Sequence, residues 1–469
     1  MNNLFGNLLR NLLEQAEVKE SQLAELLNYD TTYISKWVNG SKLPAARTSD
    51  KVLNMMSDYF ADYTDLSRRE LFYQLKKAYD SDSSYQSFQS YNNNKMSFLD
   101  NHKDLLALTR GALFQALKRN RRHIFVIASF DLFRLYGTSF KAIIRELHNA
   151  GAENVILKLA VEEDDLKNYG HFYASEILSC ISGLDYIEMS IVCRKRGLPK
   201  ILVVEDFLCM QMLWNKAGEL GAIFSTEKDI IDKFYPVCTE ILDREKKLLD
   251  PAPPENLRKT NTQLDSYSDK RQWLFYNEPP ALLFPDEVMD FFAAEAEDKD
   301  YRMYLTKLKN VFNTRTKKSR IDLVLYSSVI NDYLKNGEVS VGNVEHKLSE
   351  NQIKEHLKYL SKVMEENSDF RVWLIRDTVA LNEELREAPS IFIDTHSVYI
   401  ENSQKGTCCN FHISTDPVMR KTFEEFFEGI LSQSYCSRVD SEDLLRYLLI
   451  SLRKNANLNF MNSGLYFFL

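Results

Sequence analysis

A short polar helix is predicted near the start of the chain. The stretch YDTTYISKWVNGSKLP (residues 29–44) places apolar side chains at helical spacing, begins with a capping type of residue, Asp30, and ends at Gly40. Its other face carries short hydrogen-bond donors and acceptors with one cation, which suits contact with base edges and phosphates in a major groove. The side chains expected to make these contacts are Thr31, Thr32, Tyr33, Ser35 and Lys36.

Two neighbouring helices are predicted to hold this polar face in place. The preceding segment, SQLAELLN (residues 21–28), has an apolar stripe at helical spacing, and a further amphipathic helix follows Pro44. Because two short helices joined by a tight turn bury little alone, we expect them to fix the angle of the polar helix. The predicted inward-facing side chains are Leu23, Ala24, Leu26, Leu27, Ile34, Trp37, Val38, Val52, Leu53, Met56, Tyr59 and Phe60.

The pattern LAELL…YISKWVNGSKLP resembles the Cro/C1-type (XRE) helix-turn-helix of bacterial and phage regulators, over about residues 4–60. The alanine, serine, tryptophan, glycine and proline fall at the family's spacing. The resemblance implies a double-stranded DNA operator as partner, with Thr31 and Thr32 opening the recognition helix.

Two positions depart from the family's pattern. Lys19 and Glu20 stand where a Ser/Thr–Gln pair usually contacts phosphate, so Ser21 or Gln22 is expected to take that contact. Val38 replaces the usual glutamate after the tryptophan and is expected to pack. The DNA-contacting residues predicted in addition to those of the polar helix are therefore Ser21, Gln22 and Lys42.

The N-terminal segment is electrically even. Residues 1–77 contain ten basic and ten acidic side chains, and the whole chain has a net charge of −8. Such a module binds DNA weakly alone and strongly only when two copies engage two half-sites, so a homodimer is expected. The negative total argues against a general polyanion binder.

Composition is that of an ordinary globular protein, with 44% hydrophobic and 27% charged residues in 469. No apolar run approaches the length of a membrane span, and the N-terminus lacks the basic region of a signal peptide. The seven cysteines show no zinc-ligand spacing. We therefore expect a cytoplasmic protein with reduced thiols, no metal, no cofactor and no membrane partner.

Six segments are predicted, in a multidomain chain whose all-α N-terminal helix-turn-helix domain precedes two α/β modules. The segments rich in Ser and Asn (80–97) and in Pro (250–270) are interpreted as linkers. The predicted boundaries are 1–78 for the DNA-binding domain, 79–100 for a linker, 101–249 for the first α/β module, 250–300 for a linker with connecting helices, 301–436 for the second α/β module, and 437–469 for a C-terminal helix and tail.

The two α/β modules are predicted to be repeats. HIFVIAS (123–129) starts the first in the same way as RIDLVLYS (320–327) starts the second. Each is followed by an amphipathic helix, a strand, a Pro-led apolar strand ending in an acid, and a closing helix. The duplicated halves would pack together as a pseudo-dimer.

This order of elements is weakly similar to the phospholipase D-like fold, including the degenerate sensor modules of TrmB-like regulators. Catalytic members carry H-x-K-x4-D in each half. The corresponding patterns here are Leu198-x-Lys200-x4-Glu205 and Glu387-x-Pro389-x4-Asp394. Because both nucleophilic histidines are missing, the resemblance implies a protein that is not an enzyme.

Other candidate residues are less specific. The basic run Arg194-Lys195-Arg196, with Lys200, could bind an anionic small-molecule or peptide effector between the halves, or form a solvated hairpin tip. His171 and His396 could line a pocket or be structural. His356 with Lys358 imitates half of a phosphodiesterase motif and is interpreted as a surface pair within a helix.

The favoured hypothesis is a sequence-specific transcriptional regulator, with a repressor as the expected type, whose C-terminal region dimerises and senses a signal. Two alternatives remain open at this point. One is a phosphodiesterase or nuclease-like enzyme targeted by the N-terminal domain. The other is a protein-binding scaffold or defence component.

Overall fold

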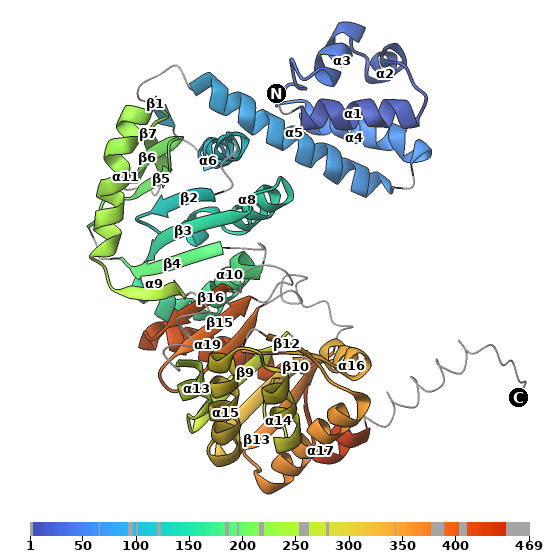
Figure 1. Ribbon diagram of the computed structural model, residues 1–469. Coiled ribbons are helices and arrows are strands. Elements are labelled where there is room, and N and C mark those ends of the chain that lie inside the picture. Colours follow the sequence, from blue (N-terminus) through green and yellow to red (C-terminus); the bar gives the residue numbers. More distant parts are fainter. Residues whose placement is uncertain are drawn as a thin grey trace, which may run out of the picture. The chain divides into compact units, whose positions relative to one another are not determined.

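The protein is mixed α/β in the computed structural model (Figure 1), in which helices flank a large mixed sheet. The structure describes residues 3–446 except for 65, 92–96, 100–101, 120–122, 183–186, 195–196, 215–219, 253–261, 278–280, 343, 377–388 and 403–409. The chain divides into two compact units, Met1–Arg121 with Lys200–Val237 and Arg122–Pro199 with Cys238–Leu469. Among the described helices, none is both long and apolar enough to cross a membrane.

The first unit begins with helices that share one hydrophobic core. Residues from Phe5 to Tyr79 form this core, with Trp37 and Leu53 almost fully buried. The predicted inward-facing side chains are confirmed except for Leu26, which is 40% exposed, and Tyr59, which is partly buried. The helices are α1 (Leu4–Gln15), α2 (Glu20–Leu27), α3 (Thr31–Val38), α4 (Ser49–Phe60), the 3-10 turn η1 (Ala61–Tyr63) and α5 (Arg68–Tyr91).

The remainder of the first unit is a small antiparallel sheet with a helix against it. Its strand order is β1-β7-β6-β5, and α6 contacts β5 and β7. The segment 79–100, expected to be a linker, is helical as far as Tyr91 because α5 continues through it. The elements are β1 (Ser97–Leu99), α6 (His102–Lys118), β5 (Ile201–Val204), β6 (Leu208–Trp214) and β7 (Leu220–Ser225), followed by α11 (Lys228–Asp243), which spans the boundary between the units.

The second unit begins with three parallel strands joined by helices. Strands β2, β3 and β4 are neighbours in that order and are connected through helices, as parallel strands require, and β8 adds antiparallel to β4. The elements are β2 (His123–Ala128), α7 (Leu132–Tyr136), α8 (Thr138–Asn149), β3 (Asn154–Val161), α9 (Glu163–Asn168), α10 (Gly170–Ser182), β4 (Ile187–Cys193) and β8 (Lys247–Ala252).

A second set of parallel strands follows in the same unit. Strand β10 lies between β9 and β13, parallel to both, and β17 pairs antiparallel with β13. The elements are α13 (Thr262–Tyr267), β9 (Arg271–Tyr276), α14 (Asp286–Glu295), α15 (Lys299–Thr314), η2 (Thr316–Lys318), β10 (Arg320–Tyr326), α16 (Ser327–Asn336), β11 (Glu338–Val341), β12 (Val344–Lys347), α17 (Glu350–Glu366), β13 (Phe370–Ile375), β14 (Ser390–Ile393), β15 (Val398–Asn402), β16 (Asn410–Ser414), α19 (Pro417–Leu431) and β17 (Cys436–Val439).

The chain repeats its order of elements, in a different alignment from the one expected. The series β2, β3, β4, β5, β6, β7, α11, β8 corresponds to β9, β10, β13, β14, β15, β16, α19, β17. Strand β10 was expected to match β2, but it matches β3, and the counterpart of β2 is β9. We call β2 to β8 the first repeat and β9 to β17 the second repeat.

Strand β8 joins the two repeats within the second unit. It is hydrogen-bonded to β4 along one edge and to β16 along the other, with Pro251 opposite His412. His412 is fully buried, and its Nε2 accepts a hydrogen bond from the Met189 backbone N–H at 3.0 Å. Burial lowers the pKa of His412 to about 3, so this histidine is neutral in the folded protein.

Candidate nucleic-acid interface

The start of α3 is set by two residues between it and α2. Helix α2 ends at Asn28, whose φ of 55° is left-handed, a conformation that asparagine tolerates better than most residues. Asp30 then caps α3, because its Oδ1 accepts a hydrogen bond from the Thr32 backbone N–H at 2.8 Å. The chain therefore turns sharply and restarts as helix at Thr31, as predicted.

The end of α3 is fixed against α1 by a close backbone approach. A β-carbon added at Gly6 would lie 2.5 Å from the Trp37 carbonyl oxygen, so only glycine fits there. The Val38 carbonyl accepts hydrogen bonds from Asn3 Nδ2 at 2.8 Å and from an Arg10 guanidinium nitrogen at 3.3 Å. These contacts hold α3 at a fixed angle to α1, so its polar face has one orientation within this group of helices.

The polar face of α3 is exposed as predicted. Thr31, Thr32, Tyr33 and Lys36 are exposed, and Ser35 is half-buried. The Thr32 hydroxyl donates to the Asp30 carboxylate, and this bond, with the one from the Thr32 N–H, lowers the pKa of Asp30. Lys36 Nζ lies 5.9 Å from the centre of the Tyr33 ring. The face thus offers hydroxyl, phenol and ammonium groups to a partner.

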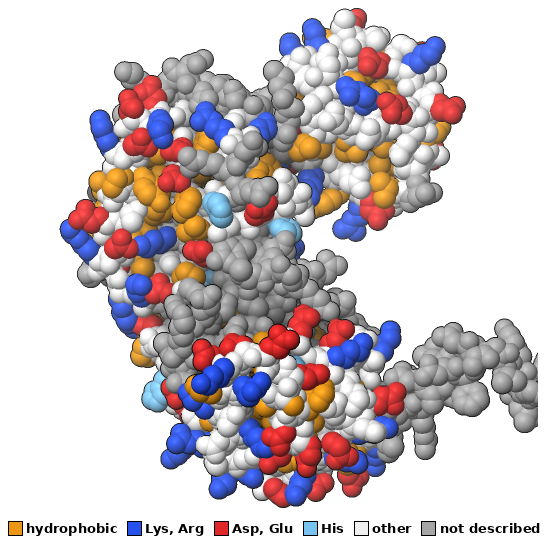
Figure 2. Space-filling view, in the orientation of Figure 1, with side chains coloured by type: hydrophobic (Ala, Val, Ile, Leu, Met, Phe, Trp, Pro, Cys, Tyr) orange, Lys and Arg blue, Asp and Glu red, His pale blue; other side chains and the backbone are white. Residues whose placement is uncertain are grey.

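Three other predicted DNA contacts lie around this face with different roles. Ser21 is exposed on α2, and Lys42 is exposed after α3. Gln22 accepts the Lys19 backbone N–H at 2.9 Å through its Oε1, so its amide serves the start of α2. Acidic and basic side chains both appear over these helices, at the upper right of Figure 2, as the even charge count of residues 1–77 requires.

The predicted anion-binding run has one described cation, and it is buried. The Arg194 side chain is 6% exposed and contacts Glu162 Oε1 at 2.8 Å. Its other nitrogens donate to the carbonyls of Ser129 at 2.9 Å and Leu198 at 2.5 Å. The guanidinium therefore ties together the chain after β2, β3 and β4. Lys195 and Arg196 lie outside the described residues, and Lys200 is half-buried at the start of β5.

Of the two degenerate phospholipase D-like patterns, the structure describes all three named residues of the first and two of the second. Leu198, Lys200 and Glu205 flank β5, and Glu387 lies outside the described residues. Asp394 is buried and closes the β14–β15 hairpin, because its Oδ1 accepts the backbone N–H groups of His396 and Ser397 at 2.7 and 2.6 Å. This carboxylate supports a turn.

The histidines fall into exposed and buried groups. His171 is exposed with its ring 5.0 Å from that of Phe426, and His396 is exposed. The interpretation of His356 as a surface residue is wrong. Its Nδ1 lies 2.6 Å from the Tyr333 hydroxyl and its Nε2 lies 2.9 Å from the Leu282 carbonyl oxygen. Burial lowers its pKa to about 4, while Lys358 stays exposed.

A buried charged cluster in the second repeat was not predicted from the sequence. The Asp322 side chain is fully buried, and its Oδ2 contacts Arg271 at 2.6 Å and Arg371 at 2.5 Å. Its Oδ1 accepts a hydrogen bond from Trp373 Nε1 at 2.8 Å. The signal was present, since an aspartate inside the apolar strand RIDLVLY requires a buried partner.

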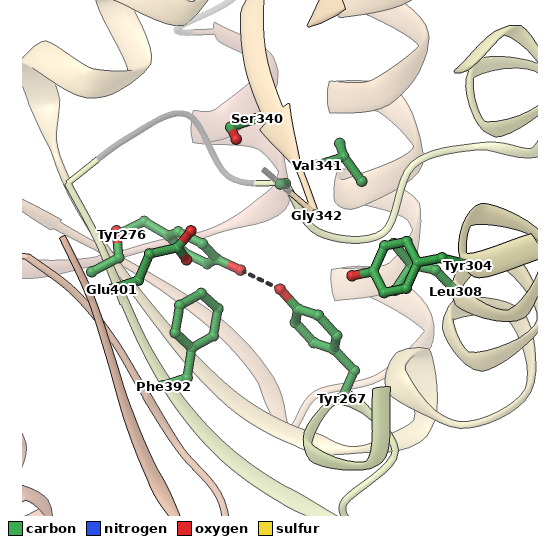
Figure 3. A pocket seen from close by; sticks show the side chains of 11 residues that line it. Tyr267, Tyr276, Tyr304, Leu308, Ser340, Val341, Gly342, Phe392 and Glu401 are labelled. Atoms are coloured by element: carbon green, nitrogen blue, oxygen red, sulfur yellow. Dashed lines mark hydrogen bonds between the residues drawn. The ribbon is translucent and has the colours of Figure 1, made fainter. Parts of the chain in front are cut away.

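One small cavity lies beside the cluster of tyrosines in the second repeat (Figure 3). The hydroxyls of Tyr267 and Tyr276 are 3.2 Å apart at its wall, and burial raises the pKa of Tyr276. Tyr304 and Glu401 also line it. Its volume of about 20 Å³ has room for about one water molecule and is too small for an effector.

The described residues form neither a metal site nor a site for thiol chemistry. No group of three or more His, Cys, Asp or Glu side chains could hold a metal ion there. No disulfide joins the described cysteines, and burial raises the pKa of Cys209 to about 11 and of Cys238 to about 12. Their thiols are thus protonated and unreactive at neutral pH.

No protein-family model and no curated protein matches the chain. Several solved structures resemble it. The archaeal chromatin protein TrmBL2 has a TM-score of 0.26 and 12% identity, over 49% of this chain and all of that one. Phosphatidylserine synthase of Haemophilus influenzae Rd KW20 has a TM-score of 0.29 and 11% identity, over 81% of this chain and 98% of that one. The phospholipase D family member Nuc of Salmonella typhimurium has a TM-score of 0.24 and 11% identity, over 32% of this chain and 97% of that one. TM-scores this low carry no information on the function of the chain.

Proposed function

We propose that the chain is a sequence-specific DNA-binding regulator that reads DNA with α3 of an N-terminal helix-turn-helix domain. The observation that carries this proposal is the exposed face of Thr31, Thr32, Tyr33 and Lys36 on a helix locked by its neighbours. A helix of this length, held at a fixed angle with short polar side chains outward, fits a major groove. The fixed angle matters, because base reading needs donors in defined places.

The rest of the regulator is proposed to provide pairing and signalling. A homodimer is expected because one electrically even domain gains little from phosphate attraction, and two half-sites restore affinity. The repeats would form the dimerising and effector-sensing region of a cytoplasmic repressor that catalyses no reaction. In favour of a non-catalytic role, Leu198 and Glu387 stand at the positions of the two histidines in the catalytic pattern, and Asp394 serves a turn.

The test is fluorescence anisotropy of the full chain with labelled DNA from upstream of its own gene and with a scrambled duplex. Thr31→Ala with Thr32→Ala removes two hydroxyls at the start of α3; that of Thr32 donates to Asp30, which leaves its oxygen as an acceptor for a base. We expect the preference for the upstream DNA to fall by roughly 10- to 100-fold, as for the loss of about one good base contact. Affinity for the scrambled duplex should change little.

The matched control is Thr306→Ala with Thr314→Ala, two exposed threonines of α15 whose hydroxyls bond to carbonyls in their own helix. Equal affinity of the native protein for the two duplexes, in the presence and absence of cell extract as a source of effector, would contradict the proposal.

A further inference from the structure

The amino-terminal end of the second-repeat strands is rich in cations. Because β9, β10 and β13 are parallel, their first residues lie at one end of the sheet, and Arg438 of β17 lies opposite Trp373, the fourth residue of β13. Segments 269–271, 315–322, 367–371 and 437–440 hold eight cations and four acids. We call the eight cations the basic end: Lys270, Arg271, Arg315, Lys317, Lys318, Arg320, Arg371 and Arg438.

Hydrogen bonds join the loops that carry these side chains. The Arg320 backbone N–H donates to the Lys270 carbonyl at 2.8 Å, and the Ile321 N–H donates to the Asp369 carbonyl at 3.0 Å. Asn367 Nδ2 donates to the Lys317 carbonyl at 3.1 Å. The cations therefore stand on a fixed framework, so little backbone entropy is lost when they bind a partner.

The inner part of the basic end keeps a positive charge. Arg271 and Arg371 both contact the single carboxylate of Asp322, so one positive charge in this trio is not offset. Arg271 also lies over the Trp273 ring, with 3.9 Å between the guanidinium carbon and the ring centre. This trio lies on β9, β10 and β13, and the outer cations Lys270 and Arg320 adjoin the first two of these strands.

The outer cations lack ionic partners among the described residues. Lys270, Arg315, Lys318, Arg320 and Arg438 are exposed, and none forms an ion pair there. Some other cations of the same repeat are paired, as Lys309 is with Asp290 at 2.7 Å. Like charges gathered without partners repel one another, so their position together is explained best by an anionic partner.

We propose that the basic end binds the phosphates of double-stranded DNA, as a second contact surface that reads no sequence. This inference rests on the proposed DNA binding. Binding DNA requires attraction to its phosphates, and the N-terminal domain does not supply it, because residues 1–77 carry no net positive charge and the whole chain has a net charge of −8. From β9 to β17 the surface spans about 14 Å, at about 4.8 Å per strand. That length of duplex carries roughly eight phosphates.

The experiment measures the salt dependence of DNA affinity of the full chain. The variant Lys270→Gln, Lys318→Gln, Arg320→Gln removes three exposed charges, and unpaired surface side chains like these contribute little to folding. The slope of log affinity against log salt should become shallower by up to about 2.7, at about 0.9 for each phosphate contact. The change should be the same for upstream and scrambled DNA.

The matched variant is Lys299→Gln, Lys347→Gln, Lys354→Gln, which removes the same charge from other parts of the second repeat. Its slope should equal that of the native protein. An unchanged slope in the basic-end variant would overturn the inference, and so would a native protein that binds neither duplex at low salt. If the slope falls but the native protein shows no sequence preference, the proposed function fails and the basic end stands.

Discussion

The face of α3 and the basic end of the second repeat offer opposite chemistry to a partner. On α3, hydroxyl and phenol groups surround one lysine in a region where acids and bases balance. On the basic end, exposed cations lack partners among the described residues. Hydrogen-bonding groups discriminate between bases, whereas charges attract any duplex. In the proposed function, base recognition and attraction to phosphates therefore belong to different segments, which separate variants can test.

The largest expected effect comes from the carboxylate beneath the basic end. Asp322→Ala leaves Arg271 and Arg371 without their counter-charge and Trp373 Nε1 without its acceptor. Removing one partner of a buried ion pair costs about 3–5 kcal/mol of the free energy of unfolding. Urea denaturation followed by tryptophan fluorescence measures this loss.

Asp332→Ala, on the exposed side of α16, provides the comparison and should change the free energy of unfolding by no more than about 0.5 kcal/mol. A loss below about 1 kcal/mol in Asp322→Ala would mean that the trio does not support the basic end.

Lowering the pH should destabilise the repeats before the N-terminal helices, because the first histidine of the chain, His102, comes after those helices. Burial lowers the pKa of His356 to about 4 and of His412 to about 3, against 6.5 ordinarily. Between pH 6.5 and these values the unfolded chain binds more protons than the folded one, so stability falls as pH falls. From pH 7 to 5 the expected loss is about 2 kcal/mol for each histidine.

The measurement is urea denaturation at pH 7 and pH 5. His412→Gln keeps an acceptor for the Met189 N–H but does not titrate, so its loss between the two pH values should be smaller by about 2 kcal/mol. His396→Gln, at an exposed position, should behave as the native protein does. Equal pH dependence in all three proteins would show that His412 is not held neutral.

The smallest expected effect concerns the cation beside α3. Lys42→Gln removes one exposed charge after the helix, so the slope of log affinity against log salt should become shallower by about 0.9. Sequence preference should stay as it is, in contrast to the threonine variants. A loss of preference would indicate that Lys42 contacts a base.

Local signals in the sequence predicted the N-terminal helices well. The start of α3 at Thr31 and its end at Val38 follow from Asp30 and from Asn39-Gly40, which act within one turn of the helix. Strands β2 and β10 begin at the expected residues and each ends one residue earlier than the expected 123–129 and 320–327. Apolar runs bounded by polar residues determine such strands without help from the rest of the chain.

Features that depend on distant residues could not be predicted in this way. The segment RQWLFY of β9 follows a polar stretch and was taken as part of a connecting region, which displaced the alignment of the repeats. His356 shares its helix with charged neighbours, and only Tyr333 and Leu282, from other elements, show that its ring is buried. The basic end joins four segments that lie far apart in the sequence.

The pairing of β8 with β16 has a consequence for biosynthesis. Ala252 of β8 is made about 160 residues before its partner Phe411, so the outer edge of the first repeat waits roughly 10–30 s on the ribosome without that partner. An open strand edge of this kind invites pairing with other nascent chains. Pro251 offers no backbone N–H to such a strand, so the edge is protected from aggregation until its own chain completes it.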